Sequence, residues 1–162
     1  MAIEAPASKY RKNNLKIYIA ACIIFAVIFA YDGYLSKYKW SMRYAFYEKH
    51  VLNNNNKPDD MMVWNQKWIP ITCGSIAVLF GAALFAIHNK KIVADENELV
   101  INDKEKIPYD SIQKIDKTSF SSKGFFLITY KNKDGREVNR KISDRAYDNL
   151  AAVLDKLVAK IS

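Results

Sequence analysis

The 162-residue sequence has few of the residues from which most catalytic and metal sites are built. It contains only two histidines, His50 and His88, and neither has a second histidine or a cysteine at a metal-ligand spacing. It also lacks a Gly-rich phosphate loop and a nucleophile elbow. We therefore expect no enzymatic activity, no metal, no cofactor and no small-molecule substrate.

Cysteine is equally scarce: Cys22 and Cys73 are the only two, and each lies inside a long apolar run. If the two runs form an antiparallel hairpin in a membrane, the cysteines lie at opposite depths, too far apart for a disulfide. We expect two free thiols.

Positive charge is in excess but is not concentrated anywhere. The chain has 25 Lys and Arg against 17 Asp and Glu, a net charge of +8, spread along its length. Without a dense basic block, a nucleic-acid partner is not expected. Basic residues that flank the apolar runs are candidate contacts with anionic lipid headgroups, each contributing about 1 kcal/mol near a membrane surface. These candidates are Lys9, Arg11, Lys12, Lys90 and Lys91.

The first apolar run, Ile17 to Tyr31, contains no charged residue. Its extension to residues 15–35 reaches a transmembrane length, with Lys16 and Asp32 at the two interfaces. The basic residues in front of it also fit a secretory signal peptide, but no small-residue cleavage site follows. We therefore predict a retained transmembrane helix at residues 15–35, preceded by a basic segment at residues 1–14.

The second apolar run, residues 68–89, has no formal charge and predicts a second transmembrane helix. Gly74, Ala77 and Gly81 recur at helical spacing and form a candidate helix-packing face. That face would contact either the first helix of the same chain or another membrane subunit.

Two spans place both termini on one side of the membrane. Six basic residues flank the termini and six lie in the connecting loop, so the count alone decides nothing. The terminal basic residues lie closer to the spans, and we therefore predict that both termini are cytoplasmic.

Residues 36–67 connect the two spans and are rich in aromatic residues. The spacing of Leu35, Tyr38, Met42 and Phe46 predicts that the first helix continues, as an amphipathic helix, to about Leu52. The sequence NNNNKPDD should then break it, with Asp59 or Asp60 capping the helix that leads into the second span.

The aromatic residues of this connection suggest a contact surface. Tyr38, Trp40, Tyr44 and Tyr47 form a candidate docking surface for another protein, because Tyr and Trp are enriched in interface cores. The alternative is a helix that lies in the membrane interface or packs on its neighbouring helix.

Residues 90–162 have the pattern of a small β-rich domain. Short strands are predicted at KIVA and ELVIN, a longer one at GFFLITYK, a tight turn at NKDG and a further strand at REVNRKIS. A helix follows from Asp144, a plausible N-cap, to Ile161, with one apolar stripe that would cover the sheet.

The segment EKIPYDSIQKID joins the early strands to the later ones, and its apolar residues should lie in the core. Its pattern, carried by Ile107, Pro108, Tyr109, Ile112 and Ile115, resembles the segment found in bacterial pleckstrin-homology-like (PH-like) domains that are attached to transmembrane hairpins. The resemblance covers residues 90–162. It implies a two-helix transmembrane hairpin with a small PH-like domain, a non-catalytic interaction module at the bacterial inner membrane.

Three functions remain open. The first is a membrane-anchored scaffold whose domain binds itself or a protein partner. The second is an accessory subunit of a large respiratory or photosynthetic membrane complex. The third is a sensor of anionic lipids. The expected partners are the lipid bilayer and either other membrane-protein subunits or further copies of the chain.

Overall fold

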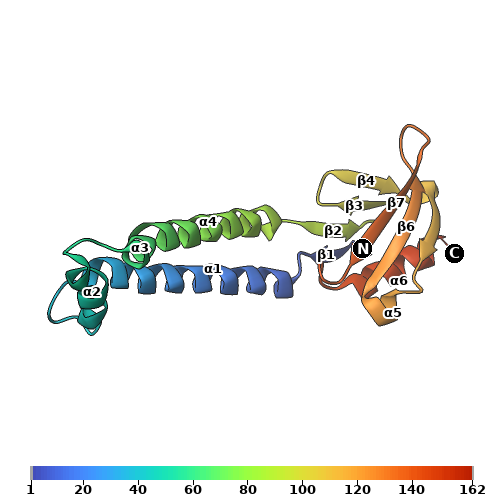
Figure 1. Ribbon diagram of the computed structural model, residues 1–162. Coiled ribbons are helices and arrows are strands. Elements are labelled where there is room, and N and C mark those ends of the chain that lie inside the picture. The colour runs from blue at the N-terminus through green and yellow to red at the C-terminus, as the bar shows by residue number, and fades with distance from the viewer. Residues whose placement is uncertain (1, 162) are drawn as a thin grey trace. The chain divides into compact units, whose positions relative to one another are not determined.

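The computed structural model describes residues 2–161, and the chain divides into two compact units (Figure 1). One unit joins the residues up to Asn14 to those from Phe85 onward, and the other contains Leu15–Leu84. In the sequence, the helical unit is therefore inserted between two segments of the sheet unit.

The sheet unit has two antiparallel sheets and ends in a helix. In the first sheet the strand order is β1-β2-β3-β4, and in the second it is β5-β6-β7. The strands are β1 (Ile3–Pro6), β2 (Lys91–Ala94), β3 (Glu98–Ile101), β4 (Glu105–Pro108), β5 (Ile112–Asp116), β6 (Phe125–Lys131) and β7 (Glu137–Ser143). The short helices η4 (Tyr109–Ser111) and α5 (Phe120–Lys123) connect strands, and the terminal helix is α6 (Leu150–Ile161).

One apolar core lies between the sheets and α6. Alternate residues of the strands are buried, as a half-exposed sheet requires. The strands contribute Ile92, Leu99, Ile107, Phe126 and Ile128, among others. The stripe predicted on the last helix is confirmed, because Leu150, Val153, Leu154 and Leu157 all join this core.

Strand β1 is the element that sequence reasoning missed. It pairs antiparallel with β2, from Ile3 opposite Ala94 to Pro6 opposite Lys91, and Ala5 is completely buried. Four residues with a proline show no clear period, so the sequence pattern predicts no strand in residues 1–14. β1 precedes the two long helices and β2 follows them, and the two strands are neighbours in one sheet. The sheet unit is therefore complete only when the segments before and after the helices pair.

The segment between β7 and α6 holds β1 in place. Ser8 N donates to the carbonyl of Ala146 at 2.9 Å, and Asp148 N donates to the carbonyl of Pro6 at 2.9 Å. The carboxylate of Asp148 accepts from Lys9 N at 3.0 Å, at the first residue of α1 (Lys9–Ala30). It thereby satisfies one of the free N–H groups at that helix end.

The predicted start of the last helix at Asp144 is wrong, since α6 begins only at Leu150. Ala146, Tyr147 and Asp148 make backbone contacts with the N-terminal segment. Asp144 itself packs on Gly124, which has φ +68°, and its carboxylate occupies the space that a Cβ there would need. Asp144 N also donates to the carbonyl of Gly124 at 2.8 Å.

The segment EKIPYDSIQKID forms β4, the helical turn η4 and β5, and its apolar residues lie in the core as predicted. Ile107 and Ile112 are buried in the core, and Ile115 is packed against it. No side chain caps this helical turn. The hydroxyl of Ser111 donates instead to the carbonyl of Pro108, at 2.7 Å.

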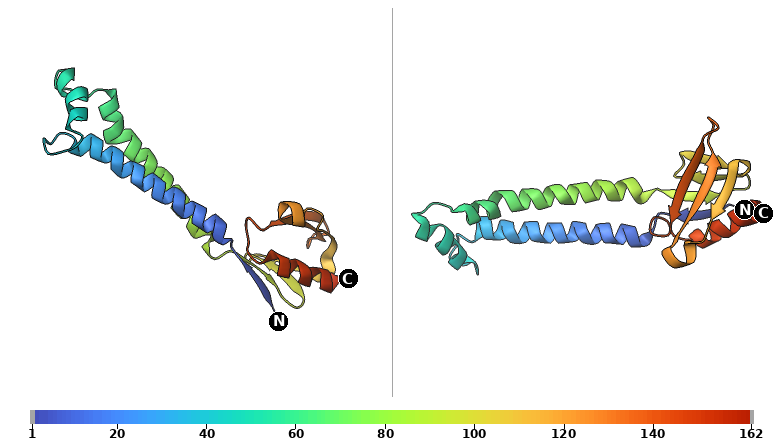
Figure 2. Two further views of the ribbon diagram at one scale, coloured as in Figure 1. Left: turned by 90° about the horizontal axis from the view of Figure 1, so that it is seen from below. Right: turned by 45° about the vertical axis from the view of Figure 1, so that its right-hand side comes forward.

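The helical unit consists of two long apolar helices packed side by side, which run in opposite directions (Figures 1 and 2). Helix α1 continues into a π-helical turn, η1 (Tyr31–Leu35). The partner begins as α3 (Asp60–Val63) and continues through η3 (Trp64–Trp68) into α4 (Ile69–His88). The rings of Tyr18 and Phe80 meet with their centroids 5.5 Å apart.

Both helices are apolar and long enough to cross a membrane, and their most apolar windows are unburied. Side chains such as Ile24, Val27, Val78 and Leu79 are more than half exposed. Such surface is stable in lipid but not in water, so it suggests insertion into a membrane. Cys22 and Cys73 are both free thiols, as predicted.

The predicted continuation of the first helix to about Leu52 is wrong. The helix ends after Leu35, the chain turns back, and a separate helix α2 spans Tyr44–His50, followed by the short turn η2 (Leu52–Asn54). The turn lets Arg43 reach Asp32 with two hydrogen bonds of 2.8 Å, which a continuous helix would prevent. Met42, expected on the apolar stripe, is 94% exposed.

The rest of the connection agrees with the prediction. Asn55 and Asn56 adopt positive φ and end the helical segment, a conformation that asparagine tolerates. Asp59 caps α3, where its carboxylate accepts from Met62 N at 2.9 Å. The same carboxylate contacts His50 Nδ1 at 2.7 Å and so links the end of α2 to the start of α3.

The fold predicts that the sheet unit cannot form from residues 89–161 alone. Without β1, the edge of β2 and the site of Ala5 are exposed, and several hydrogen bonds of about 1 kcal/mol each are lost. That loss is comparable to the whole stability of a small domain. Residues 2–8 joined to residues 89–161 through an Asn-Gly turn should unfold cooperatively on heating, followed by circular dichroism. Equal cooperativity of the two chains would contradict the assignment of β1.

Candidate functional sites

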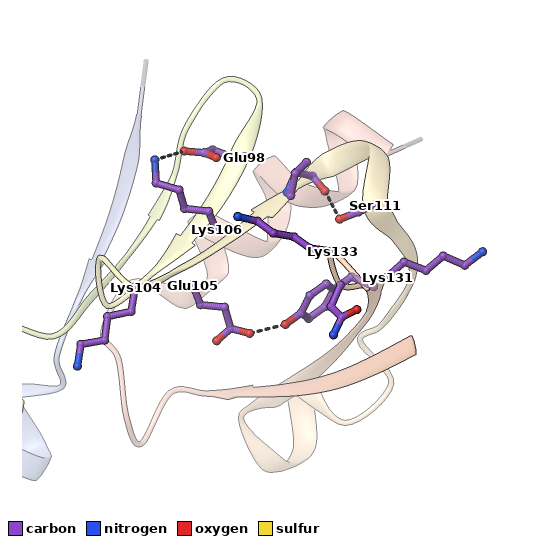
Figure 3. Close-up of a pocket in the computed structure, with 10 residues that line it drawn as sticks. Glu98, Lys104, Glu105, Lys106, Ser111, Lys131 and Lys133 are labelled. Atoms are coloured by element: carbon purple, nitrogen blue, oxygen red, sulfur yellow. Dashed lines mark hydrogen bonds and ion pairs between the residues drawn. The ribbon is translucent and has the colours of Figure 1, made fainter. Parts of the chain in front are cut away.

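A charged groove runs along β4, the edge strand of the first sheet (Figure 3). Its cavity volume is about 620 Å³. Side chains from β3, β4, β6 and the β6–β7 turn line it. The lining residues are Glu98, Lys104, Glu105, Lys106, Pro108, Ser111, Tyr130, Lys131, Asn132 and Lys133.

Two tight turns place the lysines of the groove. Asn102 and Asp103 adopt positive φ in the β3–β4 turn, and Lys104 follows them directly. In the β6–β7 turn, Asn132 Oδ1 accepts from Asp134 N at 2.8 Å and from Arg136 N at 3.1 Å. Figure 3 shows Lys133 directed across the groove, while Lys104 and Lys131 point outward on opposite sides.

The two carboxylates of the groove have their own cations. Glu98 pairs with Lys106 at 3.1 Å, and Glu105 pairs with Arg140 at 3.1 Å. In contrast, Lys104, Lys131 and Lys133 form no salt bridge within residues 2–161. The groove therefore keeps a surplus of positive charge and can bind an anionic group.

Tyr130 holds Glu105 in place from the floor of the groove. Its hydroxyl donates a hydrogen bond to Glu105 Oε1. Burial, together with this bond to a carboxylate, raises the pKa of Tyr130 to about 12. Tyr130 is therefore a neutral donor at physiological pH, and Glu105 can bridge it to Arg140.

An acidic hollow adjoins the groove and shares Glu98 and Pro108 with it. Its cavity volume is about 510 Å³. It is lined by Asp95, Glu96, Asn97, Glu98, Pro108 and Asp110. The hydroxyl of Tyr109 donates to the carbonyl of Asp95 at 2.8 Å and so fixes the β2–β3 turn. A basic groove and an acidic hollow thus lie next to each other along β4.

The basic residues predicted to contact lipid are not part of this groove. Lys9 begins α1, and Lys90 and Lys91 lie where the chain re-enters the sheet through β2. Lys91 forms a salt bridge of 3.0 Å with Glu4 across the β1–β2 pair, which raises the pKa of Lys91. The predicted lipid contact of these residues stays a prediction, as does that of Arg11 and Lys12 in the first turn of α1.

A buried polar cluster closes the far end of the helical unit, and sequence reasoning missed it. Asp32 is 6% exposed and accepts both bonds from Arg43, whose pKa this contact raises. Ser36 and Ser41 are buried beside it, and the Ser36 hydroxyl donates to the carbonyl of Asp32. The sequence predicts Asp32 as an interfacial charge but does not predict its partner, because Arg43 reaches it only through the unpredicted turn.

The two π-helical turns meet in the same cluster. Gln66 Nε2 donates to the carbonyl of Gly33 at 2.8 Å, and the Tyr34 hydroxyl donates to the carbonyl of Gln66 at 2.9 Å. A Cβ on Gly33 would lie 2.8 Å from Gln66 Cα, so only glycine fits. Asn65 is 2% exposed, and its Oδ1 has no hydrogen-bond donor within residues 2–161.

The aromatic residues predicted as a docking surface form two pairs. The rings of Tyr38 and Trp40 stack at 5.6 Å, and those of Tyr44 and Tyr47 lie 6.2 Å apart. Trp40 is 69% exposed, whereas Tyr44 and Tyr47 are half-buried. Their role in docking stays a prediction.

Gly74, Ala77 and Gly81 lie on the half-buried positions of α4. A Cβ on Gly74 or Gly81 would meet no atom within 4 Å, so neither glycine makes a close helix contact within this chain. The contact of this face with another membrane subunit stays a prediction.

Within residues 2–161, no group of three or more His, Cys, Asp or Glu side chains is placed to hold a metal ion. No model of a known protein family matches the sequence, and no match is found among curated proteins or solved structures. The geometry of the sites therefore carries the functional interpretation.

The close contact at Gly33 generates a prediction with two matched controls. Gly33→Ala should destabilise the helical unit by about 1–3 kcal/mol, because Gln66 must move. Gly74→Ala and Gly81→Ala should be neutral or stabilising by up to about 1 kcal/mol, because a helical glycine is replaced where space is free. Thermal unfolding of the full chain in detergent measures all three. Equal effects of the three substitutions would argue against the Gly33–Gln66 contact.

The raised pKa of Tyr130 generates a pH prediction. The protonated phenol is stabilised in the folded state, so its contribution is present below pH of about 10 and is lost as the pH rises through about 12. Tyr130→Phe should lower stability by about 1–2 kcal/mol at neutral pH. It should also flatten the loss of stability between these two pH values, as followed by denaturant unfolding. If the substitution left the loss of stability at high pH unchanged, Tyr130 would not be the group whose titration causes that loss.

Proposed function

We propose that this protein is a non-enzymatic, membrane-anchored interaction protein of the bacterial inner membrane. Two transmembrane helices hold a PH-like domain at the cytoplasmic surface, where the domain binds a second copy or a protein partner. The observation that carries the proposal is the pairing of β1 with β2 across the inserted helices.

That pairing constrains the membrane topology. Two hydrogen-bonded strands lie on the same side of a membrane, so the chain between them crosses it an even number of times. The two apolar helices supply one crossing in each direction. A signal peptidase cut after the first helix would remove β1 from the domain, so the pairing also supports a retained anchor.

The connections between the domain and the helices are short. Only Ala7 and Ser8 separate β1 from α1, and both are buried and hydrogen-bonded. Only Asn89 and Lys90 separate α4 from β2. A domain joined in this way stays at the membrane surface, which suits a scaffold rather than a tethered domain that searches a large volume.

The PH-like assignment rests on the strand arrangement and the segment that resembles the family. Four strands form one antiparallel sheet, three form the other, and a terminal helix completes the core. The isoleucines of the resembling segment face that core. The exposed charged surfaces along β4 then provide the means to bind a partner.

A second candidate, an accessory subunit of a large membrane complex, is favoured by the far end of the helical unit. Trp40, Trp64 and Trp68 are each more than half exposed there, together with Met42. Tryptophan at this level also fits the lipid interface, so the exposure supports this function less directly than β1 supports the first.

Site-specific photo-crosslinking in native membranes tests the proposal, with the crosslinker placed on the exposed Lys131 and, as a control, on the lipid-facing Val78. The proposal expects discrete adducts from residue 131, identified by mass spectrometry as the same chain or one partner. Adducts from residue 78 alone, with subunits of a large complex, would favour the second candidate. No protein adduct from residue 131 would overturn the scaffold function.

A further inference from the structure

A loop of mixed aromatic and basic residues follows the first long helix. Residues 37–42 read KYKWSM, and every one of them except Ser41 is exposed. The side chains of Trp40 and Met42 are the most open, at 69% and 94% exposed, and the Trp40 ring stacks on that of Tyr38. Large apolar side chains that are exposed next to one another mark a contact surface.

Two buried serines hold this loop in a fixed shape. Ser36 is completely buried at its start, and Ser41 is 6% exposed near its end. Ser41 N donates to the carbonyl of Tyr38 at 2.9 Å, and Ser41 Oγ is hydrogen-bonded to the Tyr31 hydroxyl at 3.1 Å. Arg43 N donates to the same Oγ at 3.2 Å. Because the backbone is already ordered while the rings stay exposed, binding through the rings costs little conformational entropy.

The lengths of the two long helices give the depth of the loop. Residues 17–35 of the first helix rise by about 28 Å, close to the roughly 30 Å of a hydrocarbon core. Residues 68–88 of the partner helix rise by about the same distance. The hydrogen bond from Gln66 to Gly33 holds these two helix ends at one level. In a membrane spanned by both helices, the loop therefore lies in the headgroup layer, on the side opposite the chain termini.

The loop and the adjoining turn η3 carry positive charge. Lys37 and Lys39 of the loop and Lys67 of η3 form no salt bridge within residues 2–161. Asp32, the acid at this level, is neutralised by Arg43. Lysine is depleted in the cores of protein interfaces, whereas Trp, Tyr and Lys together are typical of membrane interfaces. The composition therefore favours an anionic lipid surface over a protein partner.

We propose that residues 37–42 form a lipid-binding loop that enters the headgroup layer of the leaflet opposite the chain termini. Trp40 and Met42 contact the first methylene groups of the acyl chains. Lys37 and Lys39 bind the phosphate groups of anionic lipids. The loop would then anchor the hairpin at the end that carries no folded sheet, and this inference does not depend on what the sheet unit binds.

Tryptophan fluorescence of the full-length chain in lipid vesicles tests the depth of the loop. Trp64→Phe with Trp68→Phe leaves Trp40 as the only tryptophan. The control chain carries Trp40→Phe in addition, with Lys133→Trp as a probe on an exposed turn of the sheet unit. Lipids brominated near the headgroup end of the acyl chains should quench more than half of the Trp40 emission, and aqueous iodide should quench little of it. The control probe should show the reverse.

The choice of brominated lipid tests the role of the lysines. In mixed vesicles of phosphatidylcholine and phosphatidylglycerol, either one lipid or the other carries the bromine. Brominated phosphatidylglycerol should quench Trp40 more strongly, as expected for a roughly fivefold enrichment of this lipid beside the loop. Lys37→Glu with Lys39→Glu should abolish the difference. Lys117→Glu with Lys123→Glu, the same charge change at exposed positions of the sheet unit, should leave it unchanged.

Circular dichroism shows whether each variant is folded. If the tryptophan variants do not fold, a nitroxide label on Met42→Cys, with Cys22→Ser and Cys73→Ser, measures the same depth, because Met42 is exposed and makes no packing contact that the label would break. The label should be more accessible to dissolved oxygen than to a water-soluble nickel complex.

Three results would overturn the inference. Trp40 emission that iodide quenches and brominated lipid does not would place the loop in water. Equal quenching by the two brominated lipids would remove the anionic headgroups as its ligand. A discrete protein adduct from a photo-crosslinker at residue 40 in native membranes would assign the loop to a protein partner and favour the accessory-subunit function. The scaffold function is tested separately, by the adducts at residue 131, so the two can fail independently.

Discussion

The hydrogen-bonded pairing of β1 with β2 is the constraint on which the rest of the structure depends. It joins residues near the start of the chain to residues that follow both apolar helices. The core of the sheet unit includes Ala5 from β1, so this core closes only when the N-terminal strand has paired with the strands that follow the helices. Both ends of the helical segment therefore lead, in the sequence, into strands of the same sheet.

Two polar contacts fix the ends of the helices. At the start of α1, the carboxylate of Asp148 binds the backbone N–H of Lys9, so the segment before α6 contacts β1 and the helix together. At the far end, Arg43 neutralises the buried Asp32, and Gly33 allows the π-turns to meet. A buried carboxylate without its cation would cost several kcal/mol, so the turn after Leu35 is required by charge as much as by shape.

Much of the fold follows from local sequence patterns, and the elements that were missed or wrongly predicted share one cause. The apolar runs, the strands β2, β3, β6 and β7, the cap at Asp59 and the positive-φ turn at Gly135 are visible in the spacing and type of nearby residues. Strand β1, the start of α6 at Leu150 and the turn at Arg43 depend on partners distant in sequence. The charged groove was invisible for the same reason, because Lys104 and Lys133 come together only through the two sheets. The lysines of the β6–β7 turn had the composition of an ordinary solvated hairpin.

The most direct measurement of the central claim is disulfide formation in native membranes. Glu4 lies opposite Val93 at a non-hydrogen-bonded position of the β1–β2 ladder, where Cα atoms approach within disulfide range. With Cys22 and Cys73 replaced by serine, Glu4→Cys combined with Val93→Cys should form an intramolecular disulfide under mild oxidation. Glu4→Cys with Lys106→Cys, three strand positions away in the same sheet, should not. No disulfide in the first pair, or equal yields in both, would contradict a sheet that is completed by β1.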